Sequence, residues 1–114
     1  MTVEECYAAL QGDYSQACSR LHSDVIIKKF MLKFPNQCGY DKLCQAMEEE
    51  DYKEAFAAAH TLKGVCMNLS FTMLGESSSQ LTEALRNGYS DGVDKLYMQV
   101  QKDYKQTVEA IEAL

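Results

Sequence analysis

The chain has 114 residues, enough for one domain with a modest core. Hydrophobic residues make up 46% of it and charged residues 25%, the balance of an ordinary globular protein. The formal net charge of −6 disfavours partners such as DNA or RNA. No apolar run approaches the roughly 20 residues that span a bilayer, and the N-terminal residues lack the features of a signal peptide. We therefore expect a single domain over residues 1–114 that contacts neither nucleic acid nor membrane.

The cysteines indicate a reducing environment. Five of them, an odd number, lie at positions 6, 18, 38, 44 and 66, and none forms a C-x-x-C pair. With only two histidines in the chain, the spacing does not suggest a zinc site. We expect reduced thiols that serve mostly as small core residues in a cytoplasmic protein.

The apolar pattern predicts helices throughout, beginning with short ones. Thr2, with Glu5 three residues later, forms a capping box for a first helix that ends at Gly12. Asp13 can cap a second helix. After a break at residues 22–24, Ser23 can cap a third.

Pro35 is expected to stop the third helix, because a proline disfavours helical geometry in the residue before it. Asn36 can then cap the fourth helix. The fourth helix ends in the acidic run at 48–51, which gives the fifth helix a favourable negative start. The fifth helix continues from about Asp51 into the late 60s.

A turn near 70–72 leads to a sixth helix, and Ser90 or Asp91 opens the last. Short connections between amphipathic helices imply antiparallel neighbours. The expected fold class is therefore all-α: an up-and-down antiparallel four-helix bundle within about 36–113. Additional short N-terminal helices, within 2–34, should cover one end.

The fifth predicted helix contains the most informative stretch. Apolar residues recur every three or four positions along it, and His60 lies about 100° from the buried Ala59, at the edge of that stripe. Ala57, Lys63 and Gly64 share a patch of surface with His60, since they lie three or four residues from it. A glycine inside a helix costs about 1 kcal/mol relative to alanine. This one therefore suggests that something approaches the backbone closely.

The run Ala59-His60-Thr61-Leu62-Lys63-Gly64, followed by Asn68-Leu69 and by leucines 74, 81 and 85, resembles the histidine-containing phosphotransfer (HPt) family. Members are helical domains that carry a phosphoryl group on one histidine between aspartates of receiver domains. The resemblance extends from about Asp51 to Arg86 and implies a stand-alone protein, since no kinase or receiver sequence is attached. One departure is Ser70, where the family usually has glycine.

The resemblance implies that His60 is the phosphorylated residue of a multistep phosphorelay. Lys63 would neutralise phosphoryl oxygens, and Gly64 would leave access for the partner. A neutral imidazole, with an unperturbed pKa near 6.5, is a suitable nucleophile near pH 7. The chain has no Gly-rich phosphate loop to hold ATP. We therefore expect a phosphocarrier rather than an enzyme, without a metal site or cofactor of its own.

The implied partners are receiver domains of response regulators and of hybrid histidine kinases, which supply the aspartate and the Mg²⁺. Phe56, Ala57 and Met67 lie on the His60 side and could form the apolar part of a docking face, although Phe56 could equally be core. Family members often place a glutamine near the histidine from the following helix. Gln80 and Thr82 are the candidates here, and the equivalent position lies nearer Thr82. We expect the protein to be a monomer.

Three alternatives stay open. His60 could be a helical histidine with no role. The protein could be a non-transferring adaptor or inhibitor that docks a receiver or kinase domain, although the intact His60, Lys63 and Gly64 argue against it. A metal-binding or hydrolytic bundle would need inward-facing Glu and His ligands at i, i+3 spacing, and no such set surrounds His60 or His22.

Overall fold

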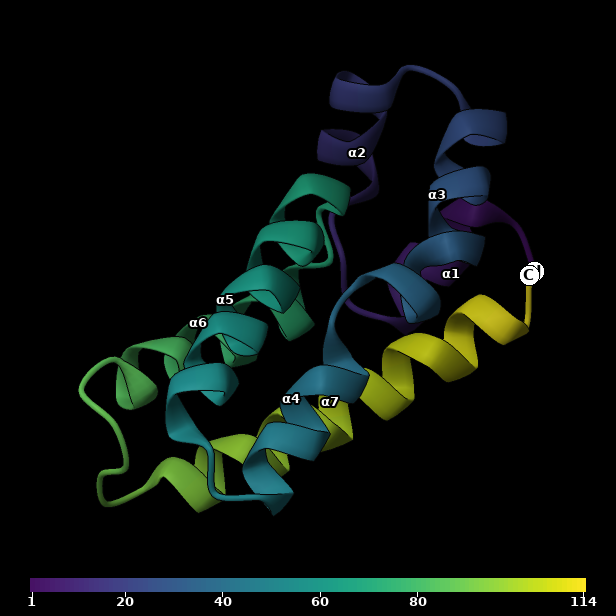
Figure 1. Ribbon diagram of the computed structural model, residues 1–114. Coiled ribbons are helices and arrows are strands. Elements are labelled where there is room, and N and C mark those ends of the chain that lie inside the picture. Colours follow the sequence, from purple (N-terminus) through teal and green to yellow (C-terminus); the bar gives the residue numbers. More distant parts are fainter.

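The computed structural model describes all 114 residues, which form helices and no strands (Figure 1). The seven helices are α1 (Val3–Ala9), α2 (Tyr14–Leu21), α3 (Asp24–Gln37), α4 (Tyr40–Glu48), α5 (Tyr52–Leu69), α6 (Thr72–Leu85) and α7 (Val93–Glu112). The prediction of an all-α fold is confirmed. No helix combines the length and the apolar character that crossing a membrane requires.

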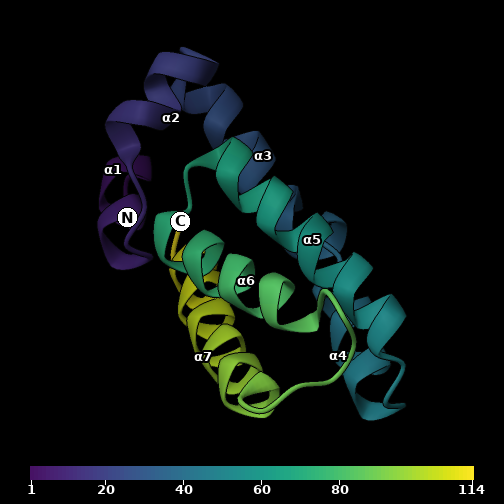
Figure 2. The same cartoon turned by 90° about the vertical axis from the view of Figure 1, so that its left-hand side faces the viewer.

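The helices α4 to α7 form the predicted four-helix bundle. They run alternately down and up, with α5 and α6 side by side and α7 on the far side of α6 (Figures 1 and 2). The bundle closes where Tyr40 of α4 stacks on Tyr104 of α7, with ring centroids 3.6 Å apart and planes 9° from parallel. Leucines at 43, 62, 74, 81 and 85 are fully or almost fully buried in its core.

The three N-terminal helices cover one end of the bundle, as predicted. An aromatic cluster joins them to the connection between α5 and α6: Phe71 lies edge-on to both Tyr7 and Phe34, at 5.7 and 5.0 Å between centroids. The buried Tyr7 hydroxyl donates to the carbonyl of Leu69 at 2.7 Å. These contacts fix the C-terminal end of α5.

The predicted side-chain caps at the starts of α1 and α2 are present, and the structure adds one at the start of α5. Thr2 and Glu5 form the capping box of α1. Asp13 accepts from the backbone N–H of Gln16 at the start of α2. Asp51 accepts from the N–H of Glu54 at the start of α5. These bonds satisfy backbone donors that the first turn of a helix leaves unpaired.

The predicted break at Pro35 is wrong. The third helix continues through Pro35 to Gln37, so Asn36 does not cap the fourth. A proline this close to the end of a helix removes few backbone bonds, and Phe34 before it is held in the core against Phe71. The break comes at Gly39, whose positive φ of 84° turns the chain into α4.

The predicted start of the last helix is also wrong by a few residues. Gly92, at a φ of 92°, precedes the first helical residue, Val93. The Ser90 hydroxyl donates instead to the carbonyl of Ala84, at 3.0 Å. Ser90 therefore stabilises the end of α6 rather than the start of α7.

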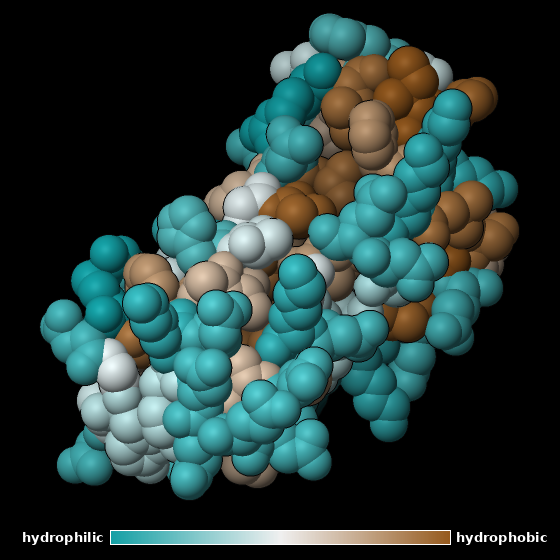
Figure 3. Space-filling view, viewed as in Figure 1, coloured by the Kyte–Doolittle hydropathy of each residue, from teal (hydrophilic) through white to brown (hydrophobic).

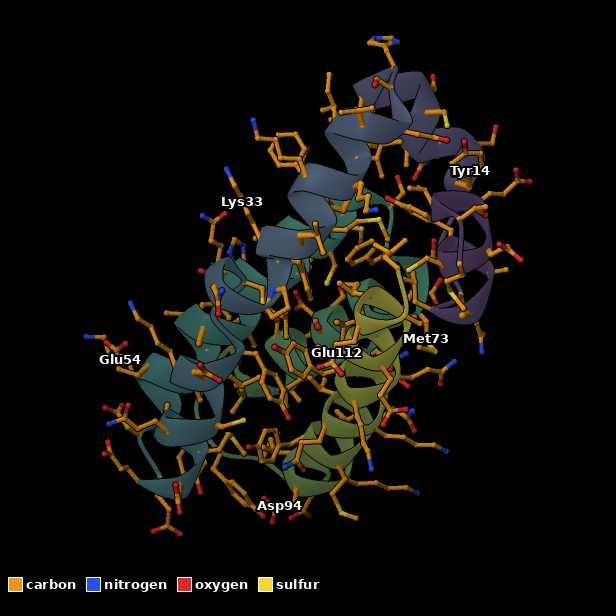
Figure 4. The ribbon with its side chains drawn as sticks, turned by 90° about the vertical axis from the view of Figure 1, so that its right-hand side faces the viewer. Tyr14, Lys33, Glu54, Met73, Asp94 and Glu112 are labelled. Atoms are coloured by element: carbon orange, nitrogen blue, oxygen red, sulfur yellow. The ribbon has the colours of Figure 1, made fainter.

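The face drawn in Figure 3 is largely hydrophilic, and its apolar side chains gather mainly toward the end formed by α2 and α3. Val25, Phe30 and Leu32 of α3 are exposed there. Lys33 of α3 and Glu54 of α5 project from the same side (Figure 4).

Ser70 ends α5 in the left-handed conformation, with a φ of 59°. This geometry is where glycine is favoured, because it lacks the Cβ that clashes there. Two hydrogen bonds hold the serine in place, one with Gln16 of α2 and one with Asp13, the residue that precedes α2. Its hydroxyl donates to Gln16 Oε1 at 2.8 Å, and its carbonyl accepts from the N–H of Asp13 at 2.8 Å. The departure from glycine is thus accommodated by contacts of this chain.

Two substitutions isolate how much the left-handed backbone conformation of Ser70 affects the stability of the protein. Ser70→Gly and Ser70→Ala both remove the hydrogen bond to Gln16, but only glycine relieves the left-handed conformation. We expect Ser70→Gly to be more stable than Ser70→Ala by about 1 kcal/mol in the free energy of unfolding. Urea unfolding of both variants measures this difference. Equal free energies of unfolding would contradict the left-handed conformation of residue 70 at the end of α5.

Candidate functional site

His60 lies midway along α5 on a surface that no other helix covers. The helix buries small side chains on its inner side, among them Ala55, Ala58 and Ala59. This close packing holds α5 firmly against α4 and α6. The outer side, with His60 exposed, therefore presents the imidazole from a rigid support.

The backbone beside His60 is bare at Gly64. A Cβ built on this glycine would meet no atom within 4 Å. Packing therefore does not explain the glycine, unlike the case at Gly12, where a Cβ would lie 2.7 Å from the carbonyl oxygen of Ser70. Ala57, one turn before His60, adds only a methyl group to the same surface. The face is consequently open to close approach by another molecule.

On the α6 side of His60, three side chains follow one another: Phe56, Arg86 and Glu83. The Phe56 and His60 rings lie 6.2 Å apart, inclined by 38°. The guanidinium carbon of Arg86 lies 5.4 Å from the centroid of the Phe56 ring. Arg86 is bound in turn by Glu83, through Nη2–Oε1 at 2.7 Å and Nε–Oε2 at 3.1 Å. The two side chains form the only ion pair within the chain.

Electrostatics connects Glu83 to the histidine face. Its hydrogen bonds with Arg86, and then the charge of Arg86, lower the pKa of the Glu83 carboxyl. The charge of Lys63, and that of His60 in its protonated form, lower it further. Two cations, Lys63 and Arg86, and one carboxylate thus surround an imidazole that projects into solvent.

The sequence did not reveal Glu83 or Arg86 as members of this site. Glu83 lies on α6 and Arg86 caps its C-terminal end, and only the packing of α6 against α5 brings them to the side of Phe56. Their i, i+3 spacing of opposite charges was a usable signal for a helical ion pair. It could not indicate which neighbouring helix the pair faces.

The structure brings most of the predicted site residues together. Ala57, His60 and Gly64 lie on the outer surface of α5, and Met67 is 47% exposed one further turn along. Lys63 is half-buried on the α6 side of the same surface. Their roles in transfer and docking stay predictions. Phe56 is half-buried and packs against the core, so it belongs to the core as well as to the surface.

The two α6 candidates lie elsewhere. Thr82 is completely buried and its hydroxyl donates to the carbonyl of Ser78 at 2.7 Å, so the prediction that it contacts a partner is wrong. It lies on the side of α6 that packs into the bundle. Gln80 is exposed but borders α7, where it lines a cavity of about 350 Å³ with Gln99 and Lys102. The structure therefore separates Gln80 from the His60 face.

A groove of about 480 Å³ borders the opposite side of the histidine surface. It lies between α5 and the link from α3 to α4, with Ala57 and Thr61 on one wall and Gly39 and Tyr40 on the other. The His60 surface is thus bounded by charged groups of α6 on one side and by a groove on the other.

The cysteines and the remaining histidine form no second site. All five cysteines are free, and burial raises the pKa of the Cys6, Cys38 and Cys66 thiols. His22 is exposed at the left-handed end of α2. No three His, Cys, Asp or Glu side chains gather in a group that could hold a metal ion.

The comparison with protein families gives one match. The family model of the Hpt domain matches residues 40–113, which include α4 to α7 and the whole His60 surface. Comparisons with curated proteins and with solved structures give no significant match.

Because no atom lies near the missing side chain of Gly64, adding one carbon there should stabilise the helix. We expect Gly64→Ala to raise the free energy of unfolding by up to about 1 kcal/mol. The reverse change on the same exposed surface, Ala57→Gly, should lower it by a similar amount. Denaturant unfolding measures both. A loss of stability in Gly64→Ala would mean that the glycine has a structural role.

Proposed function

Because the chain belongs to the Hpt domain family, and so has a phosphotransfer role in a phosphorelay, we propose that its phosphocarrier residue is His60. The observation that supports this most strongly is an exposed imidazole on a rigid helix, one turn from the bare backbone of Gly64. Phosphoryl transfer depends more on positioning and charge neutralisation than on covalent chemistry by the protein. Both are available on this surface.

The proposed step transfers a phosphoryl group from an aspartyl phosphate of a receiver domain. The unprotonated ring nitrogen of neutral His60 attacks phosphorus with its lone pair, and an N–P bond forms. The bond between phosphorus and the aspartate oxygen breaks, and its electron pair leaves with the carboxylate. The other ring nitrogen keeps its proton, so the product is a phosphorylated imidazolium. The reverse reaction passes the group to a second aspartate.

The surrounding residues have separate parts in this proposal. Lys63 neutralises the phosphoryl oxygens as they arrive beside His60. Gly64 and Ala57 allow the active-site loops of the receiver to approach the helix, and Met67 and Phe56 supply apolar contact. The receiver brings the aspartate and its Mg²⁺, so this chain needs no cofactor. We further propose that it acts as a monomeric phosphocarrier in the cytoplasm, without phosphorylating itself from ATP.

Replacing the nucleophile tests the site assignment. We expect His60→Gln to fold normally, because the side chain is exposed, and to accept no phosphoryl group. The measurement is acid-labile label on the protein after incubation with a phosphorylated receiver domain. His22→Gln is the matched control and should be labelled like the wild type. Label retained in His60→Gln would contradict the assignment.

Replacing Gly64 and replacing Lys63 should impair phosphoryl transfer in different ways. Gly64→Gln fills the open space beside His60, so docking should weaken and the transfer rate should fall on the order of 100-fold. Lys63→Ala removes a charge and leaves access unchanged. Docking should then persist while transfer slows by roughly 10- to 150-fold, since a charge-assisted hydrogen bond contributes about 1.5–3 kcal/mol.

A binding titration and a single-turnover transfer rate distinguish the two effects. Gly64→Ala is the graded control for the larger glutamine and should lie between it and the wild type in rate. If Gly64→Gln transferred as fast as the wild type, close approach to α5 would not be required. An adaptor that docks without transferring would then become the better account.

A further inference from the structure

The contacts on the α6 side of His60 form an ordered sequence of groups. Glu83 binds Arg86 through two hydrogen bonds, Arg86 covers the Phe56 ring, and the Phe56 ring neighbours the imidazole. One aromatic ring therefore separates a guanidinium from the nitrogen that would carry the phosphoryl group. Arg86 is close to the site without occupying it.

The ion pair between Arg86 and Glu83 is weak enough for Arg86 to exchange Glu83 for another partner. Their side chains are 53% and 58% exposed, so solvent screens the attraction between them. Exposed ion pairs typically contribute little to stability, and side-chain rotation alone can break this pair. Arg86 can therefore leave Glu83 without disturbing the fold.

A phosphoryl group on His60 would change the competition for this guanidinium. Guanidinium binds phosphate and carboxylate by the same two-pronged geometry, which the ammonium of Lys63 does not offer. A phosphoryl group also carries more negative charge than a carboxylate. The charge of Lys63, and that of His60 when it is protonated, lowers the pKa of the Glu83 carboxyl, so the carboxylate and the new group would share one electrostatic neighbourhood.

We propose that Glu83 is a positioning residue that holds Arg86 over Phe56 while His60 is unmodified and releases it to the phosphoryl group after transfer. This inference rests on the proposed function of His60. Its consequence is a limit on how tightly the protein retains phosphate. Part of the attraction between Arg86 and the phosphoryl group is offset by the loss of the pair with Glu83, so the group remains easy to pass on.

The test compares Glu83→Gln, Arg86→Gln and the double variant with the wild type. Each is loaded from a phosphorylated receiver domain. Two quantities are measured: the equilibrium between phosphorylated receiver and phosphorylated His60, and the hydrolysis lifetime of the isolated phosphoprotein. Glu109→Gln is the control, since it also removes an exposed carboxylate, but from α7. A thermal melt confirms that each variant is folded.

We expect Glu83→Gln to shift the equilibrium toward phosphorylated His60, and to lengthen its lifetime, by about two- to fivefold, the range for an exposed charge pair. Arg86→Gln should shift both quantities in the opposite direction. In the Arg86→Gln background, Glu83→Gln should have almost no effect, because its action passes through Arg86. The control variant Glu109→Gln should behave as the wild type. A merely structural pair would leave the equilibrium and the lifetime unchanged.

Other results would overturn the inference. If Glu83→Gln behaved as the wild type, Arg86 would not be shared with the phosphoryl group. If its effect persisted in the Arg86→Gln background, or were matched by Glu109→Gln, the carboxylate would act only through its own charge. These failures are distinguishable from a failure of the proposed function. If the proposed function were wrong, wild-type His60 would take no label at all, and the inference about Glu83 would be wrong as well.

Discussion

The close packing of α5 between α4 and α6 is the constraint on which the rest of the site depends. Small side chains such as Ala55 and Ala59 allow the helices to approach, and they leave the opposite side of α5 uncovered. The aromatic contacts of Tyr7 and Phe71 then hold the C-terminal end of the same helix. His60, the proposed nucleophile on this helix, is exposed and yet rigidly placed, as the proposed transfer between two proteins requires.

Charge is distributed unevenly around that nucleophile. The chain as a whole is acidic, with a formal net charge of −6, but two cations flank His60. Lys63 is free of ion pairs, while Arg86 is held by Glu83. A fixed cation and an exchangeable one would serve different needs, since the group must be attracted on arrival and must still leave. Strong retention and rapid transfer are opposed, and a competing carboxylate offers a way to balance them.

Local features of this protein were predictable from its sequence, and features that depend on packing were not. His60 and Gly64 were found together because helical periodicity alone places them on one surface. Arg86 was missed because its position beside α5 depends on how α6 packs. The burial of Thr82 has the same cause. Pro35 was misjudged as a helix end because its local preference was outweighed by the burial of its neighbours in the core.

The most direct test of the account is to locate the phosphoryl group on the wild-type protein. The protein would be incubated with a phosphorylated receiver domain, digested under alkaline conditions that preserve phosphohistidine, and mapped by tandem mass spectrometry. The account predicts one phosphorylated residue, His60, whose label is lost in acid. Phosphate on His22 or on a hydroxyl side chain, or no transfer to a folded protein, would contradict it.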